Sequence, residues 1–309
     1  MSLTPEQDAP RLPAAPDAAF RDAVTFAFGD PAAQLYGHAR IGLGADGPSG
    51  VAVLFAGSEV VSASAEGGVA AAEEAPASWE SVRVAGLRTS VEEPLQAWTV
   101  SYEGDDGAGF DLRFEARSAP AVLATDSELA RTGGMEGYEQ LCSVTGTVRH
   151  GGREQQVRCL GQRGHIWGAP DWKRLGLARA LSAWLGADRA VMLAAARPAR
   201  ARGHGEEAVA GWLVDVGDPQ PINEPRLSTT YDGGLHQQRA GLELWMDEES
   251  EFPRRASGQV LCATTLELGD VRLETAFFGW RMEGREGVGR YDVMRRAAAG
   301  GGGGSSRKR

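Results

Sequence analysis

Apolar and polar residues alternate with a period of two through most of the chain. Phe26 and Phe28 alternate in VTFAF, and Trp98, Val100 and Tyr102 alternate in AWTVSYEG. A period of two places successive side chains on opposite faces of an extended strand, so that one face is buried. Short stretches of this kind, separated by turn residues, are typical of sandwiches and barrels. The sequence therefore predicts an all-β fold.

The second half of the chain repeats this pattern, which favours a two-domain arrangement. We place the boundary near residues 168–174 and expect one domain over residues 21–168 and another over residues 169–296. Each is long enough to close one barrel of about eight to ten strands. The stretch LGLARALSAWL, at residues 175–185, fits helical spacing and strand alternation alike. Periodicity alone does not decide between the two for so short an apolar run.

The two ends of the sequence differ from the rest in composition. Residues 1–20 contain four prolines that break any helix there, namely Pro5, Pro10, Pro13 and Pro16. Residues 297–309 contain a run of glycines, which lose the most conformational entropy on ordering, followed by SSRKR. We expect disordered tails over residues 1–20 and 297–309.

Charge and cysteine content narrow the class of partner. The net charge of −10 argues against nucleic acid and against anionic lipid, both of which attract basic faces. No apolar run approaches the about 20 residues that span a bilayer, and the polar start of the sequence lacks a secretory signal. The three cysteines are odd in number and lack the spacing of metal ligands. We expect a cytoplasmic protein with reduced thiols and without integral membrane association.

One glycine-rich motif matches the dinucleotide-binding pattern, but the residues that follow it argue against a nucleotide site. GLGADG, at residues 42–47, fits G-x-G-x-x-G, but the strand-like VAVLF follows it where the dinucleotide fingerprint requires a helix. The sequence also lacks a Walker A motif and a nucleophile elbow. No His lies three to five residues from another His or a Cys. We therefore predict no metal and no cofactor.

The densest group of chemically active residues is GQRGHIWGAPDW, at residues 161–172. In a strand, His165 and Trp167 point to the same face. A His beside a Trp inside a barrel can exchange a proton next to an apolar ligand, and the Trp face can stabilise a developing cation. The other interpretation is that His165 and Trp172 are hydrogen-bonded core residues at a seam between domains.

Two further stretches carry candidate site residues. Tyr138-Glu139-Gln140 precedes the same hairpin and offers acid–base groups, or else forms the polar rim of a strand. Tyr291 and Asp292 lie in the final strand, where they can point into a barrel mouth. We select His165, Asp171 and Asp292 as candidate catalytic residues. The candidate substrate-binding residues are Tyr138, Gln140, Arg163, Trp167, Trp172 and Tyr291.

The segment that holds these residues resembles a known signature. YEQLCSVTGTVRHGGREQQVRCLGQRGHIWGAPDW is similar to the central signature of the hydroxyneurosporene synthase (carotenoid 1,2-hydratase)-like and AttH-like families. EEPLQAWTVSYEG, FDLRFEA and the closing FFGWRMEGREGVGRYDVMRR resemble the flanking strands of those families. In this chain Gly164 stands where those families carry an acidic residue, and Ile166 stands where they carry a serine.

The resemblance implies two consecutive lipocalin-like (calycin) barrels, with the motif between them, and an apolar cavity. It also implies cofactor-free acid catalysis that hydrates or cyclises isoprenoid double bonds, with the family's His and Trp mapping onto His165 and Trp167.

Three hypotheses follow. The first is an enzyme in which His165, with Asp171 or Asp292, protonates an alkene of a terpenoid, polyene or steroid-like molecule while Trp167 and Tyr138 shield the cation. The second is a non-catalytic protein that binds a lipid or another hydrophobic metabolite. The third is a scaffold with a filled core. The enzyme hypothesis requires that a carboxylate converge on His165.

Overall fold

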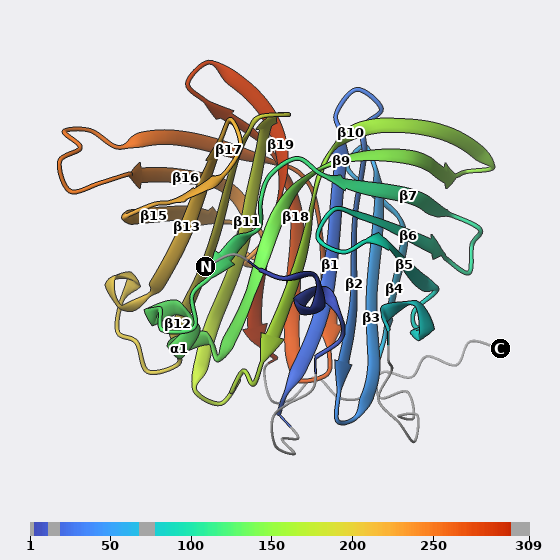
Figure 1. The fold of residues 1–309 in the computed structure, drawn as a ribbon, viewed down its shortest axis with the longest axis horizontal. Coiled ribbons are helices and arrows are strands. Elements are labelled where there is room, and N and C mark those ends of the chain that lie inside the picture. Colours follow the sequence, from blue (N-terminus) through green and yellow to red (C-terminus); the bar gives the residue numbers. More distant parts are fainter. Residues whose placement is uncertain (1–2, 12–18, 68–77, 298–309) are drawn as a thin grey trace.

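The computed structural model describes residues 3–11, 19–67 and 78–297, and these residues form two curved antiparallel sheets (Figure 1). The first sheet has ten strands: β1 (Arg21–Asp30), β2 (Leu35–Gly44), β3 (Gly47–Ala56), β4 (Glu59–Glu66), β5 (Leu87–Glu93), β6 (Ala97–Glu103), β7 (Gly109–Ala116), β8 (Ala121–Leu123), β9 (Met135–His150) and β10 (Arg153–Gly168). The second has nine: β11 (Leu175–Gly186), β12 (Arg189–Pro198), β13 (Ala208–Asp215), β14 (Pro219–Pro221), β15 (Glu224–Tyr231), β16 (Gln237–Trp245), β17 (Arg254–Leu268), β18 (Val271–Met282) and β19 (Arg285–Arg296).

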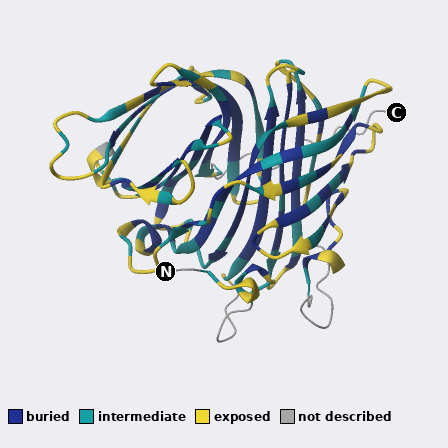
Figure 2. Cartoon of the chain, turned by 45° about the horizontal axis from the view of Figure 1, so that its top comes forward, coloured by how far each residue is buried: buried dark blue, intermediate teal, exposed yellow. Residues whose placement is uncertain are grey.

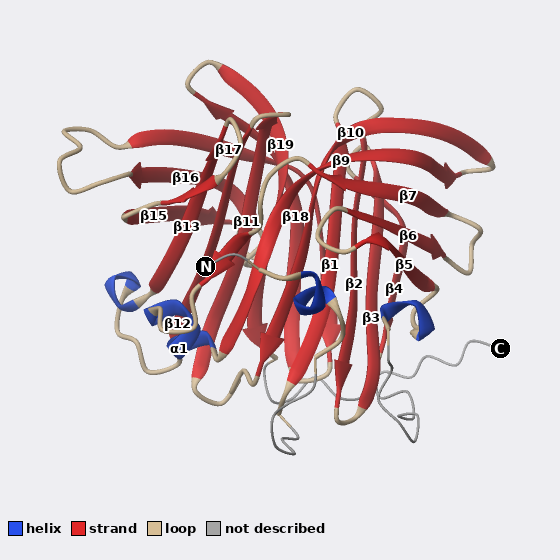
Figure 3. Cartoon of the chain, in the orientation of Figure 1, coloured by secondary structure: helices blue, strands red, loops and turns tan. Residues whose placement is uncertain are grey.

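Helical segments are short and few among the described residues (Figure 3). They are α1 (Glu128–Gly133) and the 3-10 turns η1 (Pro5–Asp8), η2 (Trp79–Ser81) and η3 (His204–Glu206). None of the described helices is long and apolar enough to cross a membrane. The all-β prediction is therefore confirmed.

Both sheets have the same topology. The strand order is β4-β3-β2-β1-β10-β9-β7-β6-β5 in the first and β14-β13-β12-β11-β19-β18-β17-β16-β15 in the second. The short strand β8 of the first sheet lies outside this order and pairs with β9. In each sheet the long closing hairpin, β9–β10 or β18–β19, returns to pair with the opening strand, β1 or β11. This repeated arrangement is the one expected of two lipocalin-like units.

Buried residues line the strands of both sheets (Figure 2). Apolar side chains on the two faces of each sheet form separate cores. Phe26 and Phe28 of β1 point into the core enclosed by the first sheet, whereas Ala27 faces the second sheet. The cluster between the sheets includes Tyr36 and Phe277, whose ring centroids lie 5.5 Å apart. We call this layer the seam. Because the central strands are buried on both faces, they read as nearly continuous apolar runs.

The ambiguous stretch 175–185 is a strand, β11. Leu181 belongs to the core of the second sheet, and Trp184 belongs to the seam. Burial on both faces produces the apolar density that imitates helical spacing.

The start of the chain corrects one expectation. Residues 1–20 were predicted to be disordered, yet Thr4 precedes the turn η1 and the carboxylate of Asp8 is buried against the first sheet. The anchor is one polar side chain, which leaves no trace in hydrophobic periodicity. Residues 12–18 of that predicted tail lie outside the described residues, as do residues 298–309 of the predicted C-terminal tail.

Candidate active site

Three strands of the first sheet bring polar side chains onto its inner face. Arg163, His165 and Trp167 alternate along β10 and therefore share that face. The register places His165 opposite Tyr138 of β9 on one side and opposite Val24 of β1 on the other. His165 is 0% exposed and Arg163 is 2% exposed. Of the predicted site residues, the structure brings Arg163, His165, Trp167 and Tyr138 together.

A carboxylate converges on His165. Its Nε2 lies 2.7 Å from Oδ1 of Asp22 on β1, and both side chains are fully buried. The backbone N–H of Arg11 donates to Oδ2 of Asp22 at 2.6 Å, so both carboxylate oxygens are used. When Nε2–H donates to Asp22, Nδ1 is the ring atom left to hold or release a proton. Among the described residues, Nδ1 of His165 has no hydrogen-bond partner.

Aromatic rings enclose this histidine. The ring centroids of Trp167, Trp79 and Tyr138 lie 5.1, 5.6 and 5.9 Å from that of His165, with interplanar angles of 72°, 86° and 72°. The guanidinium carbon of Arg11 lies 3.5 Å from the Trp167 ring centroid, on the side of the N-terminal segment. His165 therefore occupies an aromatic box that excludes water and can stabilise positive charge.

Next to the box, the carboxylate of Asp8 is enclosed by four donors that we call the carboxylate cage: the backbone N–H of Leu95, the indole of Trp98, the hydroxyl of Tyr138 and the guanidinium of Arg163. Leu95 N and Trp98 Nε1 lie 2.6 and 3.0 Å from Oδ2 of Asp8. Arg163 Nη1 lies 2.7 Å from Oδ1, which also accepts the Tyr138 hydroxyl proton. The carboxylate is thus satisfied on both oxygens.

The cage fixes the protonation states of its members. Burial opposes ionisation of Asp8, but Arg163 and the donated hydrogen bonds outweigh it and hold the pKa of that carboxyl below its ordinary value. Burial raises the pKa of Tyr138 well above its usual range, despite the opposing charge of Arg163. Tyr138 therefore stays a neutral donor, and Asp8 stays an anion.

Gln140 holds the cage arginine in place. Its Oε1 accepts from Arg163 Nη2 at 3.0 Å, and its Nε2 donates to the carbonyls of Leu95 and Ser118 at 3.0 and 2.8 Å. The guanidinium also lies over the Trp98 ring, 5.0 Å from the centroid. Gln140, which was predicted to contact substrate, orients the Arg163 guanidinium in this structure.

Asp292, predicted to assist His165, lies in the seam instead. Thr275 Oγ1 donates to its Oδ1 at 2.7 Å, and its Oδ2 lies 3.5 Å from Arg290 Nε and 4.0 Å from His38 Nδ1. Tyr291, which precedes Asp292 on β19, points to the opposite face of the sheet, because the strand period is two. The sequence pattern identified Asp292 as a candidate acid, but it could not show that Asp292 faces the seam whereas His165 lies on the inner face of the first sheet.

The seam also holds Glu139 and His38. Glu139 is the register partner of Gly164, and its Oε1 lies 3.6 Å from Arg290 Nη2. Burial raises the pKa of Glu139 to about 7 against the pull of Arg290. Burial lowers the pKa of His38 to about 4, and its neutral Nε2 accepts from Arg290 Nη1 at 2.9 Å. The carboxylate nearest to position 164 therefore comes from the adjacent strand.

Tyr291 lies on the inner face of the second sheet, in a separate polar group. Its hydroxyl lies 2.6 Å from Thr229 Oγ1 and 3.3 Å from Arg179 Nη1, and Arg179 is ion-paired with Glu207. The structure therefore does not bring Tyr291 to His165.

Asp171 and Trp172 lie in the connection between the two sheets, away from His165. Asp171 is exposed, and its Oδ1 accepts the backbone N–H of Lys173 at 2.9 Å. Trp172 is half-buried and packs against the small cluster that contains Leu175. Their nearness to His165 in sequence does not persist in space, because β10 ends at Gly168.

The sequence interpretation missed Asp22, Asp8, Trp79 and Trp98 as site residues. Asp22 did leave a signal, since it occupies the same face of β1 as Val24 and therefore places a charge at a core position. Asp8 left none. Among the described residues, no group of three or more His, Cys, Asp or Glu could hold a metal ion.

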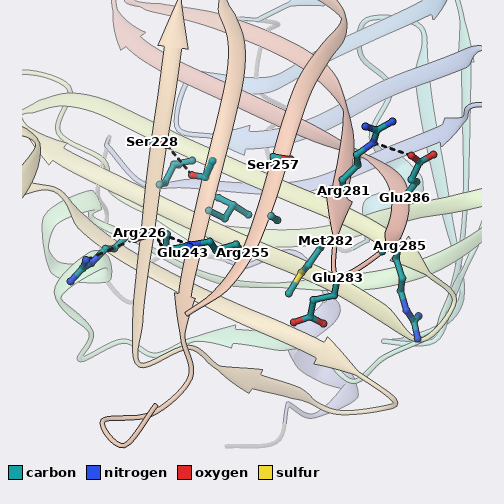
Figure 4. A pocket seen from close by; sticks show the side chains of 15 residues that line it. Arg226, Ser228, Glu243, Arg255, Ser257, Arg281, Met282, Glu283, Arg285 and Glu286 are labelled. Atoms are coloured by element: carbon teal, nitrogen blue, oxygen red, sulfur yellow. Dashed lines mark hydrogen bonds and ion pairs between the residues drawn. The ribbon is translucent and has the colours of Figure 1, made fainter. Parts of the chain in front are cut away.

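Two open grooves lie elsewhere on the surface. The larger, of about 880 Å³, crosses β15 to β18, and its arginines pair with neighbouring carboxylates, as with Arg281 and Glu286 at 2.9 Å (Figure 4). The smaller, of about 630 Å³, crosses β5 to β7. Neither is lined by a predicted site residue. We assign the candidate site to the buried group around His165. There His165 contacts Asp22, and both Tyr138 and Arg163 donate to the same oxygen of Asp8.

Comparison with known proteins identifies a matching family model and solved structures with a similar fold. A family model described as "Domain of unknown function (DUF7064)" matches residues 4–297. No curated protein sequence matches the chain. Among solved structures, CghA with Sch210972 aligns with a TM-score of 0.64 and 10% identity, over 90% of this chain and 89% of CghA.

Two further structures are similar. An AttH-like protein of Nitrosomonas europaea aligns with a TM-score of 0.63 and 12% identity, over 89% of this chain and 91% of that one. Kievitone hydratase from Nectria haematococca aligns with a TM-score of 0.61 and 10% identity, over 89% and 88% of the two chains. The predicted resemblance to AttH-like, lipocalin-like proteins is confirmed in the fold.

Proposed function

Since the chain belongs to the DUF7064 family, we infer its function from its own buried groups and propose that it binds a hydrophobic, alkene-bearing small molecule and hydrates or cyclises it by acid catalysis. The observation that carries this proposal is the His165–Asp22 pair at 2.7 Å, with Nδ1 unpartnered inside the aromatic box. A buried acid next to aromatic faces is what alkene protonation requires.

The chemistry begins with His165 as an imidazolium. Asp22 accepts Nε2–H and stabilises the positive ring, so that Nδ1–H is the acid. Transfer of that proton to one alkene carbon forms a C–H bond and leaves a carbocation on the other carbon. Trp79 and Trp167 stabilise the cation through their ring faces.

Capture of the cation decides the product. In hydration, water adds to the carbocation and returns a proton to Nδ1, so that the net change is the addition of one water molecule. In cyclisation, a second alkene of the same molecule forms the new carbon–carbon bond, and loss of a proton to Nδ1 restores the acid. Both routes regenerate His165 and consume no further reactant.

The structural neighbours support this class of reaction. One is by name a hydratase, and CghA has been crystallised with a small molecule. The terpenoid, polyene or steroid-like nature of the substrate is part of the proposal and rests on the apolar surroundings of His165.

The site is closed by residues 3–11. Arg11 covers Trp167 and binds Asp22, and Asp8 fills the cage. Residues 3–11 are not part of either sheet, so this segment can leave the site without breaking a strand pairing.

The proposal is tested by turnover in isotopic water. Wild-type protein, His165→Gln and the control His236→Gln are incubated with a panel of terpenoid and polyene alkenes in H₂¹⁸O. His236 is half-buried at a turn of the second sheet. Hydration adds one ¹⁸O per product, and cyclisation in D₂O adds one deuterium. We expect conversion by wild type and control and a loss of at least about 100-fold in His165→Gln. Equal conversion by His165→Gln would refute the assignment of His165 as the acid.

A non-catalytic binder gives a different result. Native mass spectrometry after purification would then show a bound hydrophobic molecule that leaves the protein chemically unchanged in every variant. That outcome would replace the enzyme with a carrier.

A further inference from the structure

We propose that the carboxylate cage is a receptor for the substrate, that Asp8 occupies it as an internal stand-in, and that the substrate is an amphipathic carboxylic acid. The inference rests on the proposed function, because it names the chemical class of molecule that reaches His165. It follows from the origin of the hydrogen-bonding groups in the cage: the first sheet and its connections supply the donors, and the N-terminal segment supplies the acceptor.

Every donor in the cage belongs to the first sheet or its connections. The acceptor is Asp8, which arrives from outside the sheet, 155 residues before Arg163 in sequence. Both side chains are 2% exposed, and Asp8 is the only carboxylate within ion-pair distance of Arg163 among the residues described. A buried guanidinium with a planar fork is suited to carboxylates and needs one, because an unpaired charge is costly there.

The segment that delivers Asp8 is otherwise anchored near its ends, by Leu3 against the cluster of Leu95, Tyr138 and Trp167 and by Arg11 against the Trp167 ring. Of residues 3–11, Asp8 alone is buried; the others are half-buried or exposed. Trp79 Nε1 donates to the Asp8 carbonyl at 3.1 Å, and the Arg11 N–H binds Asp22. One departure of the segment therefore frees the cage and uncovers the His165–Asp22 pair together.

Tyr138 links the two halves of the site. Its hydroxyl belongs to the cage, and its ring centroid lies 5.9 Å from that of His165. A molecule whose carboxylate replaces that of Asp8 would extend along this ring and bring a carbon a few bonds away beside Nδ1. The cage thus fixes the position of the double bond to be protonated.

Exchange of one carboxylate for another preserves the charge of the cage. A neutral alcohol with the same hydrocarbon body leaves Arg163 without a counter-charge. The receptor should therefore bind a carboxylic acid in preference to the alcohol of the same shape. An acid and its matching alcohol are the probes that test this.

The experiment uses citronellate, a short branched terpenoid acid with an isolated double bond, and citronellol, its alcohol. Asp8→Ala opens the cage, and Glu6→Ala, at an exposed position of the same segment, is the control. Melting temperature and calorimetric binding are measured at increasing probe concentration. We expect citronellate to raise the melting temperature of Asp8→Ala saturably and to bind it at least about tenfold more tightly than it binds wild type or Glu6→Ala. Citronellol should do neither.

A second variant ties binding to the cage. Trp98→Phe in the Asp8→Ala background removes a single donor while keeping an aromatic ring, and should weaken citronellate binding about tenfold. In wild type, citronellate should also speed tryptic cleavage after Arg11, since it displaces the segment.

These binding readouts do not depend on turnover. Equal binding of citronellate and citronellol, or no binding by a folded Asp8→Ala chain, would overturn the receptor. Binding of citronellate without conversion by any variant would leave the receptor standing and would refute the enzyme.

Discussion

His165 Nε2 and Asp22 Oδ1 lie 2.7 Å apart although 143 residues separate them in sequence. They meet because β10, near the end of the first sheet's sequence, returns to pair with β1, with His165 opposite Val24. The pairing of the first strand with the last therefore brings the Asp22 carboxylate to the His165 ring. The chemistry proposed for the site depends on this contact.

Asp22→Asn should reduce turnover by about 10²-fold or more. The amide keeps a hydrogen bond to Nε2 but removes the negative charge that stabilises the imidazolium. Steady-state rates across pH, with melting temperature as a check on folding, measure the effect. A rate within twofold of wild type would remove Asp22 from the mechanism.

The same contact explains what the sequence could predict. Alternation predicted the strands and placed His165 and Trp167 on one face. It could not choose the partner of His165, since that depends on which strands pair. Asp171 is six residues away in sequence and is exposed, whereas Asp22 lies at a core position of a strand that pairs with β10. A charge at a core position was the usable signal.

The division into two domains stays a prediction. The first sheet ends at Gly168 and the second begins at Leu175, but residues such as Tyr36 and Phe277 pack across the seam. We propose that the halves are separate in topology and cooperative in stability. A single calorimetric transition for the whole chain would agree with this, and two transitions would contradict it.

Asp8→Asn should lower the free energy of unfolding by about 3–5 kcal/mol at pH 7, because Arg163 is left as a buried unpaired charge. The pKa of Asp8 is depressed on folding, so its contribution is present above the unfolded value and is lost as pH falls below about 4. Urea titrations at pH 7 and at pH 3 should show the difference between variant and wild type shrinking at the lower pH. A constant difference would show that the ion pair is not its source.

Glu139→Gln should stabilise the protein at alkaline pH relative to wild type. Folding raises the pKa of Glu139 to about 7, so folded wild type keeps a proton that the unfolded chain has lost. Stability is therefore lost as pH rises from about 4.5 to 7, and glutamine abolishes this loss. The facing groups are Arg290, Asp292 and Gln162.

Between pH 5 and pH 8 the variant should gain about 2–3 kcal/mol over wild type in free energy of unfolding. His38 acts in the opposite direction, because its lowered pKa costs stability below pH 6.5, and it is present in both proteins. Parallel stability curves for the two proteins would contradict a raised pKa at Glu139.

The thiols should be unreactive in the folded protein. All three cysteines are free, and burial raises the pKa of Cys142, Cys159 and Cys262 to about 12. Since the thiolate is the nucleophile, a disulfide reagent at pH 8 should label none within minutes and all three after unfolding. Rapid labelling of one thiol in native protein would show that its strand opens locally.

Tyr138→Phe and Tyr291→Phe form a matched pair that separates stability from function. Each removes a hydroxyl that is hydrogen-bonded beside an arginine, Arg163 or Arg179, so each should cost about 1–2 kcal/mol in free energy of unfolding. Only Tyr138 touches both the cage and the aromatic box. Its variant should lower turnover about tenfold or more, whereas Tyr291→Phe should leave the rate within twofold of wild type. Equal losses of rate would contradict the assignment of the active centre to the group around His165; a loss confined to Tyr291→Phe would move it to the second sheet.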